Sequence, residues 1–157
     1  MSKFTHIDED GNARMVDVGH KPVARREACA EGWIKLGPEA FGAVVSGEVK
    51  KGDVLSVAQI AGIQAAKKTS DWIPLCHPLG LTGIDVRLKT EAPDKVHVSA
   101  RVRCDGKTGV EMEALCAVSA SLLCVYDMVK AIDKSMIIGP IQLLSKTGGA
   151  SGSWARS

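Results

Sequence analysis

The chain has 157 residues with 20 Lys or Arg against 18 Asp or Glu, which gives a formal net charge of +2. This near balance provides no general attraction to nucleic acid or to an anionic membrane, and an aromatic content of 4% leaves too few rings for stacking single-stranded bases. The length suits one domain with a substantial core, and no apolar run approaches the ~20 residues of a membrane span.

The start of the chain and its cysteines predict a cytoplasmic protein. The first residues, MSKFTHIDEDGNARM, lack the apolar core of a secretion signal. The five cysteines are odd in number and lie mostly in apolar or strand-like stretches, as the reduced thiols of cytosolic proteins do. We expect a single domain over residues 1–157, with flexible tails at about 1–15 and at about 147–157, where Gly and Ser are frequent.

The first half of the chain predicts one strand followed by two helices. Small or apolar residues alternate with charged ones over 26–36, which is typical of a strand with one buried face. Pro38 suits the first position of a short helix. Asp53 is a typical N-cap for a second helix that runs to about Lys68.

The second half predicts a hairpin, a long helix and a last strand. Alternating stretches at 84–88 and 96–104 form the hairpin, a helix follows over about 108–132, and a strand follows over 137–144. Gly139-Pro140 inside that strand predicts an edge position or a bulge. The order β, α, α, β, β, α, β favours an α+β fold: a ferredoxin-like antiparallel sheet with helices packed on one face and extra N-terminal strand and helix elements.

The long helix also predicts an oligomer. The thirteen residues from Ala114 to Tyr126 carry no charge, and apolar or small residues occupy every face. A helix that is apolar all round needs cover all round, and one small sheet covers only one side. A partner subunit is therefore expected on another side.

The stretch WIPLCHPLG holds one Cys-His pair between two prolines. Cys76 and His77 are adjacent, so their side chains diverge, and the chain has no paired Cys or His spacing that would complete a zinc site. No metal site is expected. Two interpretations stay open: a loop histidine that bonds local backbone, or a histidine on a rigid loop that contacts a ligand.

The start of the long helix predicts an anion site and a cap. The DGKTG turn lacks the glycine of a nucleotide-binding P-loop, since position 101 is Arg, but a Gly-Lys-Thr-Gly turn that opens a helix still directs free N–H groups at an anion. Thr108 and Glu111 have the spacing of a capping box. Glu113 matches an ordinary first-turn acid favoured by the helix dipole.

Asp127 and Lys130, in YDMVK, share a helix face at i, i+3 spacing. They form either a surface ion pair worth ~0.3 kcal/mol or an acid/base pair that acts on a substrate. Glu113 lies fourteen residues before Asp127, so the two are ~21 Å apart along one helix and cannot reach one reacting centre. A shared site therefore requires a long ligand or helices from two subunits.

Four stretches closely resemble the MoaC family of molybdenum cofactor biosynthesis. They are KGDVLSVAQIAGIQAAKKTSDWIPLCHPL, GKTGVEMEAL, YDMVKA and IGPIQLLSKTGG, and the likeness runs from MVDVGHK through SKTGGASG. The resemblance implies a phosphorus–oxygen lyase that converts a cyclised dihydroguanosine triphosphate to cyclic pyranopterin monophosphate and diphosphate. It also implies a homohexamer, a trimer of dimers with active sites at the dimer interfaces.

The resemblance maps a catalytic aspartate on Asp127, with Lys130 one turn on, and we expect this pair to transfer protons. The predicted substrate-binding residues are Arg26, Lys51, Lys67, Leu75, Cys76, His77, Glu111, Met112, Glu113 and Lys146. Among these, we expect the three lysines to hold the triphosphate, and His77 and Glu113 to position the base and sugar. No cofactor is required, and Mg²⁺ could accompany the diphosphate.

Two other classes of protein remain as alternatives. A non-catalytic nucleotide sensor of ferredoxin-like fold would bind the triphosphate without turnover. An RNA-binding module of the same topology would need aromatic side chains on the sheet, and the strand over 96–104 offers none.

Overall fold

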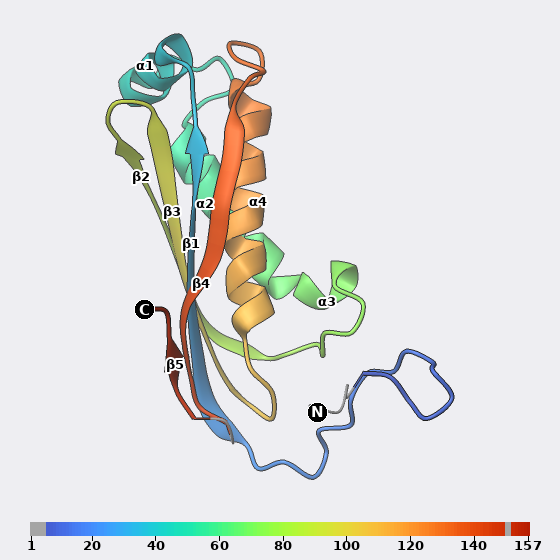
Figure 1. Cartoon of the computed structure of the whole chain (residues 1–157). Helices are drawn as coiled ribbons and strands as arrows, with labels where there is room; N and C mark the ends of the chain where they lie inside the picture. The colour runs from blue at the N-terminus through green and yellow to red at the C-terminus, as the bar shows by residue number, and fades with distance from the viewer. Residues whose placement is uncertain (1–5, 150–151) are drawn as a thin grey trace.

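Five antiparallel strands form one sheet, in the order β2-β3-β1-β4-β5, in the computed structural model, which describes residues 6–149 and 152–157 (Figure 1). The strands are β1 (Ala24–Lys35), β2 (Leu81–Glu91), β3 (Lys95–Gly106), β4 (Ile137–Thr147) and β5 (Trp154–Ala155). The helices are α1 (Pro38–Ser46), α2 (Val54–Lys67), α3 (Thr69–Trp72) and α4 (Glu111–Val129). Since α2 and α4 pack against each other and against the sheet, the predicted ferredoxin-like α+β fold is confirmed.

Several local predictions are also confirmed. Asp53 caps α2, because its carboxylate accepts a hydrogen bond from the Ser56 N–H at 3.1 Å. Pro38 occupies the first turn of α1. The ladder between β1 and β4 shifts register between Gly32 and Ile34, where Gly139 and Pro140 are inserted, so this part of β4 is bulged.

The predicted capping box at the start of α4 is wrong. The helix begins at Glu111 with Val110 at the N-cap position, and no side chain caps it. The Glu111 carboxylate instead forms an ion pair with Lys146 from the end of β4, 2.9 Å away. A charged partner from a distant strand has thus replaced the local partner that the spacing suggested.

The C-terminal segment contains a short strand in the region where a flexible tail was predicted. In β5, Trp154 and Ala155 pair with Lys146 and Ser145 of β4. Arg156 adds hydrogen bonds from its backbone N–H to the Leu144 carbonyl (2.8 Å) and from Nε to the Leu143 carbonyl (3.0 Å). The end of β4 therefore has a partner on each side.

The chain itself covers most of α4. The helix packs against the sheet on one side and against α2 on another, and Leu123 is its one large apolar side chain that stays mostly exposed, at 56%. Its length and composition alone would allow it to cross a membrane, but here it is the core helix. On the adjacent α2, Val57 and Ile60 are exposed at 43% and 67%. The apolar surface left for a partner is thus narrower than the sequence pattern predicted.

Close contact between α2 and α4 depends on Gly62. A Cβ at this position would clash with Ser121 Oγ and would lie 2.9 Å from the Ala117 carbonyl oxygen. Ser121 Oγ already donates a hydrogen bond to the Ala58 carbonyl at 2.9 Å, so it is held in place. This contact fixes the antiparallel packing of the two helices, which places the end of α2 beside the beginning of α4.

Candidate active site

Two adjoining cavities lie at the end of the fold where α4 begins. The first, here called the basic cavity, has a volume of about 320 Å³, and the second, the loop cavity, about 400 Å³. Lys21, Thr108, Gly109 and Glu111 line both, so the two cavities form one continuous depression. The Gly-Lys-Thr-Gly turn that the sequence singled out as an anion site forms the boundary between them.

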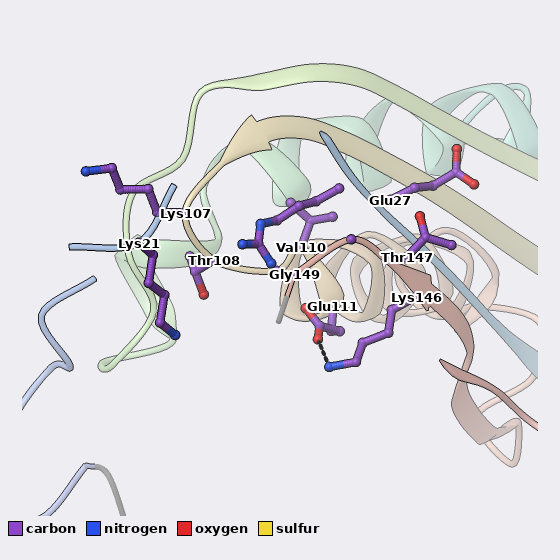
Figure 2. Close-up of a pocket in the computed structure, with 12 residues that line it drawn as sticks. Lys21, Glu27, Lys107, Thr108, Val110, Glu111, Lys146, Thr147 and Gly149 are labelled. Carbon is purple, nitrogen blue, oxygen red and sulfur yellow. Dashed lines mark ion pairs between the residues drawn. The ribbon is translucent and has the colours of Figure 1, made fainter. Parts of the chain in front are cut away.

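The basic cavity collects cations from four segments of the chain (Figure 2). Its basic residues are Lys21, Arg26, Lys107 and Lys146. The Arg26 side chain is buried and donates from Nε to the Gly106 carbonyl at 2.8 Å, which fixes its direction. The acids Glu27 and Glu111 only partly offset these charges. A cavity with an excess of positive charge is suited to a phosphate chain.

The backbone of the turn after β4 packs closely against Arg26. Gly148 and Gly149 have φ angles of 86° and 94°, which L side chains rarely adopt. A Cβ at Gly148 would clash with the Arg25 carbonyl oxygen, and one at Gly149 would clash with Arg26 Nη1. The two glycines therefore let the backbone approach the guanidinium and close one wall of the basic cavity.

The loop cavity is built around His77. Its Nε2 lies 2.8 Å from the Val16 carbonyl oxygen, and because a carbonyl can only accept, Nε2 carries a proton; in the neutral imidazole, Nδ1 is then an acceptor. The predicted contact residues Leu75, Cys76 and Met112 line the same cavity. The histidine thus bonds backbone from a distant segment and also faces the cavity, so its two interpretations are compatible.

Glu113 is a buried acid in the wall of the loop cavity. It is 4% exposed and forms no ion pair among the described residues. Burial, with a smaller contribution from the neighbouring Glu111, raises the pKa of its carboxyl to about 7, although a hydrogen bond from its own backbone N–H acts in the opposite direction. Burial also raises the pKa of the Cys76 thiol, to which the nearby Glu113 contributes. Near neutral pH, Glu113 can therefore donate a proton as well as accept one.

A separate charged cluster lies where α4 ends. Asp127 Oδ1 is 2.7 Å from Lys130 Nζ, and Oδ2 is 2.8 Å from Lys51 Nζ, which also bonds the Asp127 carbonyl at 2.9 Å. Lys130 first and Lys51 second lower the pKa of the Asp127 carboxyl to about 2. The carboxylate in turn raises the pKa of Lys130. All three side chains are about half exposed, so the cluster is open to solvent on this chain.

One chain does not bring all the predicted site residues together. The cavities gather Arg26, Leu75, Cys76, His77, Glu111, Met112, Glu113 and Lys146. Lys51, Asp127 and Lys130 lie at the other end of α4, ~21 Å away at the rise of an α-helix. Lys67 ends α2 and lines neither cavity.

The sequence interpretation missed two basic residues of the site. Lys107 is one of several lysines at the ends of predicted elements, where loops can build phosphate sites, but it is not among the predicted contacts, and its Nζ donates to the Gly19 carbonyl at 2.6 Å. Lys21 lies in an irregular segment with no periodic pattern, so nothing in the sequence indicated that it faces both cavities. Within residues 6–149 and 152–157, no group of three His, Cys, Asp or Glu side chains is arranged to hold a metal ion.

Comparisons with known proteins match nearly the whole chain. A model of the MoaC family matches residues 15–149. A cyclic pyranopterin monophosphate synthase from Halalkalibacterium halodurans is 51% identical over 160 residues, which cover 100% of this chain and 97% of that protein. Proteins of the same name from Pelotomaculum thermopropionicum and Heliobacterium modesticaldum are 53% and 54% identical, and each match covers 99% of this chain and 92% and 99% of the relative, respectively.

Proposed function

Because the chain belongs to the MoaC family, we propose that it forms cyclic pyranopterin monophosphate, an early step of molybdenum cofactor biosynthesis. The substrate would be (8S)-3',8-cyclo-7,8-dihydroguanosine 5'-triphosphate, and diphosphate would leave, as in a phosphorus–oxygen lyase. The observation that carries the proposal is the continuity of a basic cavity with one lined by His77 and Glu113. Such a depression can take a phosphate chain at one end and a heterocycle at the other.

The two cavities have different tasks in this proposal. Arg26 and Lys146 would bind the outer phosphates and stabilise the charge that develops on departing diphosphate. In the loop cavity, His77 Nδ1 would accept a hydrogen bond from the base, and Glu113 would donate one while it is protonated. Mg²⁺ would enter with the triphosphate, and no cofactor bound by the chain is needed.

Proton transfer would fall to the cluster of Asp127, Lys130 and Lys51. The structure places Lys51 beside Asp127 rather than beside Lys146, so we assign it to this cluster and not to the triphosphate. A carboxyl with a pKa of about 2 is a weak base. If a bound substrate draws one lysine away to its own oxygens, the pKa of Asp127 rises, and the carboxylate becomes a better base while Lys130 serves as an acid.

The cluster must then come from a second copy of the chain. Within one chain it is too far from the loop cavity, and its half-exposed side chains are free to enter another subunit's site. The exposed apolar residues Val57, Ile60 and Leu123 of α2 and α4 supply further surface for a partner. These features support a dimer with active sites at its interface, and three such dimers would form the homohexamer, a trimer of dimers, that we propose.

We also propose that the enzyme is located in the cytoplasm. All five cysteines are free thiols, and no two of them are joined. A reducing compartment keeps thiols in this state. The enzyme's small nucleotide-derived substrate requires neither nucleic acid nor a membrane as a partner.

The alternative of an RNA-binding module is not favoured by the open face of the sheet. Trp33 is the aromatic ring of β1 on that face and stacks on His97, with ring centroids 4.8 Å apart. The acids Glu31 and Glu91 surround the pair, at 3.0 Å from His97 Nε2 and 3.1 Å from the indole nitrogen, respectively. An acidic setting repels an RNA backbone.

A coupled assay tests the proposed activity. Purified protein is mixed with freshly generated cyclised dihydroguanosine triphosphate, and formation of the pyranopterin is followed. We expect turnover by the wild type and a loss of at least ~100-fold in Asp127→Ala and Lys130→Ala, the scale of an acid/base contribution. Lys89→Ala, which breaks an exposed ion pair on β2, is the matched control and should keep full activity. Nucleotide binding without turnover by the wild type would favour the sensor instead.

A further inference from the structure

An irregular segment before β1 is fixed across the site by two hydrogen bonds from side chains, and a third bond closes a turn within it. The Val16 carbonyl accepts from His77 Nε2 at 2.8 Å, and the Gly19 carbonyl accepts from Lys107 Nζ at 2.6 Å. A turn between these points is closed by the Lys21 N–H, which donates to the Val18 carbonyl at 3.0 Å. Side chains of both cavities therefore hold this segment, although it belongs to no helix or strand.

These hydrogen bonds position Lys21 at the boundary between the cavities. It lines both of them, together with Thr108, Gly109 and Glu111. Figure 2 shows Lys21 on one side of the opening and Lys146 on the other, with Thr108 and Glu111 between them.

Each of the other cations of the basic cavity has at least one partner within the chain. Lys146 is paired with Glu111, Lys107 bonds the Gly19 carbonyl, and Arg26 Nε bonds the Gly106 carbonyl. Within residues 6–149 and 152–157, the Lys21 ammonium has no ion pair and no hydrogen bond. A charged amine placed at a cavity boundary with its three donors free is available to a ligand.

We propose that Lys21 is a further substrate-binding residue and that it holds the phosphate nearest the sugar. The inference rests on the proposed function, which places the base in the loop cavity and the outer phosphates in the basic cavity. The chemical order of the substrate, from base through sugar to three phosphates, then brings the innermost phosphate to the boundary where Lys21 lies.

The reaction gives this phosphate a distinct fate. A cyclic monophosphate forms when a sugar oxygen attacks the innermost phosphorus, and the bond from that phosphorus to the diphosphate oxygen breaks. The innermost phosphate stays in the product, whereas the outer two leave together. Lys21 should therefore contribute to the binding of substrate and product, and the Arg26 and Lys146 end should contribute to the binding of diphosphate.

Calorimetric titration with cyclic pyranopterin monophosphate and, separately, with inorganic diphosphate tests the assignment. Lys21→Ala should bind the pyranopterin at least ~10-fold more weakly, the scale of one charge-assisted hydrogen bond, while its affinity for diphosphate changes by less than about twofold. Lys21→Arg keeps a donor and a charge and should restore most of the affinity. Lys95→Ala removes an equal charge at the far end of β3, ~36 Å along the strand from Gly106 beside the basic cavity, and should bind as the wild type does.

Two results would overturn the assignment. One is wild-type affinity for the pyranopterin in Lys21→Ala, and the other is an equal loss of diphosphate affinity. Because Lys21 is exposed, melting curves should show that each variant folds as the wild type does. Turnover by the wild type with either of these results contradicts the Lys21 assignment alone. A wild type that neither forms nor binds the pyranopterin contradicts the proposed function and this inference with it.

Discussion

Glu111 and Glu113 lie two residues apart on α4 but have opposite electrostatic surroundings. Glu111 is paired with Lys146, whereas Glu113 is buried and has no ion-pair partner in the described part of the chain. The sequence could predict that both acids begin a helix, but not this difference, because Lys146 arrives from a strand 35 positions later. Burial of Glu113 without a partner cation, which raises the pKa of its carboxyl, likewise depends on contacts with distant parts of the chain.

The pH dependence of stability should reveal the proton on Glu113. The folded pKa, about 7, lies above the ordinary value of 4.5, so the folded state binds more protons between these values and stability falls as pH rises. Each pH unit in this window is worth about 1.4 kcal/mol, and Glu113→Gln removes the effect. The melting temperature of the wild type relative to Glu113→Gln should therefore fall between pH 5 and pH 8. Equal slopes would contradict the assignment, and Glu39→Gln, at an exposed site on α1, should leave the wild-type slope unchanged.

The Asp127 cluster allows a second test of charge coupling. Removing a cation should raise the pKa of the Asp127 carboxyl from about 2 toward its ordinary range, more in Lys130→Ala than in Lys51→Ala, because Lys130 is the larger cause. A carboxyl ¹³C NMR titration measures this directly. Lys134→Ala, close in sequence but not paired with Asp127, should leave the titration unchanged. An unmoved Asp127 pKa in both paired variants would show that the ion pairs do not persist in solution.

At the scale of elements, the spacing of apolar residues and the residues typical of helix starts predicted the strands and long helices well. Burial of one face of β1 and β3 imposes the alternation that the sequence shows, and Asp53 and Pro38 mark two helix starts. The elements α3 and β5 were not predicted, because four and two residues are too short to show a period. They depend on contacts that only the assembled fold provides.

The α2–α4 contact yields a stability prediction with a matched control. Gly62→Ala places a methyl group against Ser121 and the Ala117 carbonyl, so it should lower the free energy of unfolding by ~1–3 kcal/mol, as overpacking does. Gly42→Ala, in α1 with nothing near its Cβ, should raise stability by up to ~1 kcal/mol through helix propensity. Thermal melts of both variants measure the difference. Equal stabilisation by the two changes would show that the helices pack less closely than described.

At the scale of the whole molecule, one chain holds the loop cavity and the Asp127 cluster, the two halves of the proposed shared site, at opposite ends of α4. The sequence alone predicted this separation, since the rise of a helix fixes the spacing of Glu113 and Asp127. It could not predict the path of the segment before β1, so Lys21 emerged only from the structure. Light scattering should give the mass of six 16.6 kDa chains if the proposed hexamer forms.

Co-assembly of two inactive variants tests most directly whether each site is shared between subunits. Asp127→Ala disables the cluster and His77→Ala disables the loop cavity, and each alone should lose at least ~100-fold in activity. In dimers formed at random from equal amounts, half are mixed and each mixed dimer regains one of two sites, so activity should return to about one quarter of the wild-type value. Activity that stays at the level of the single variants after co-expression would contradict the shared site.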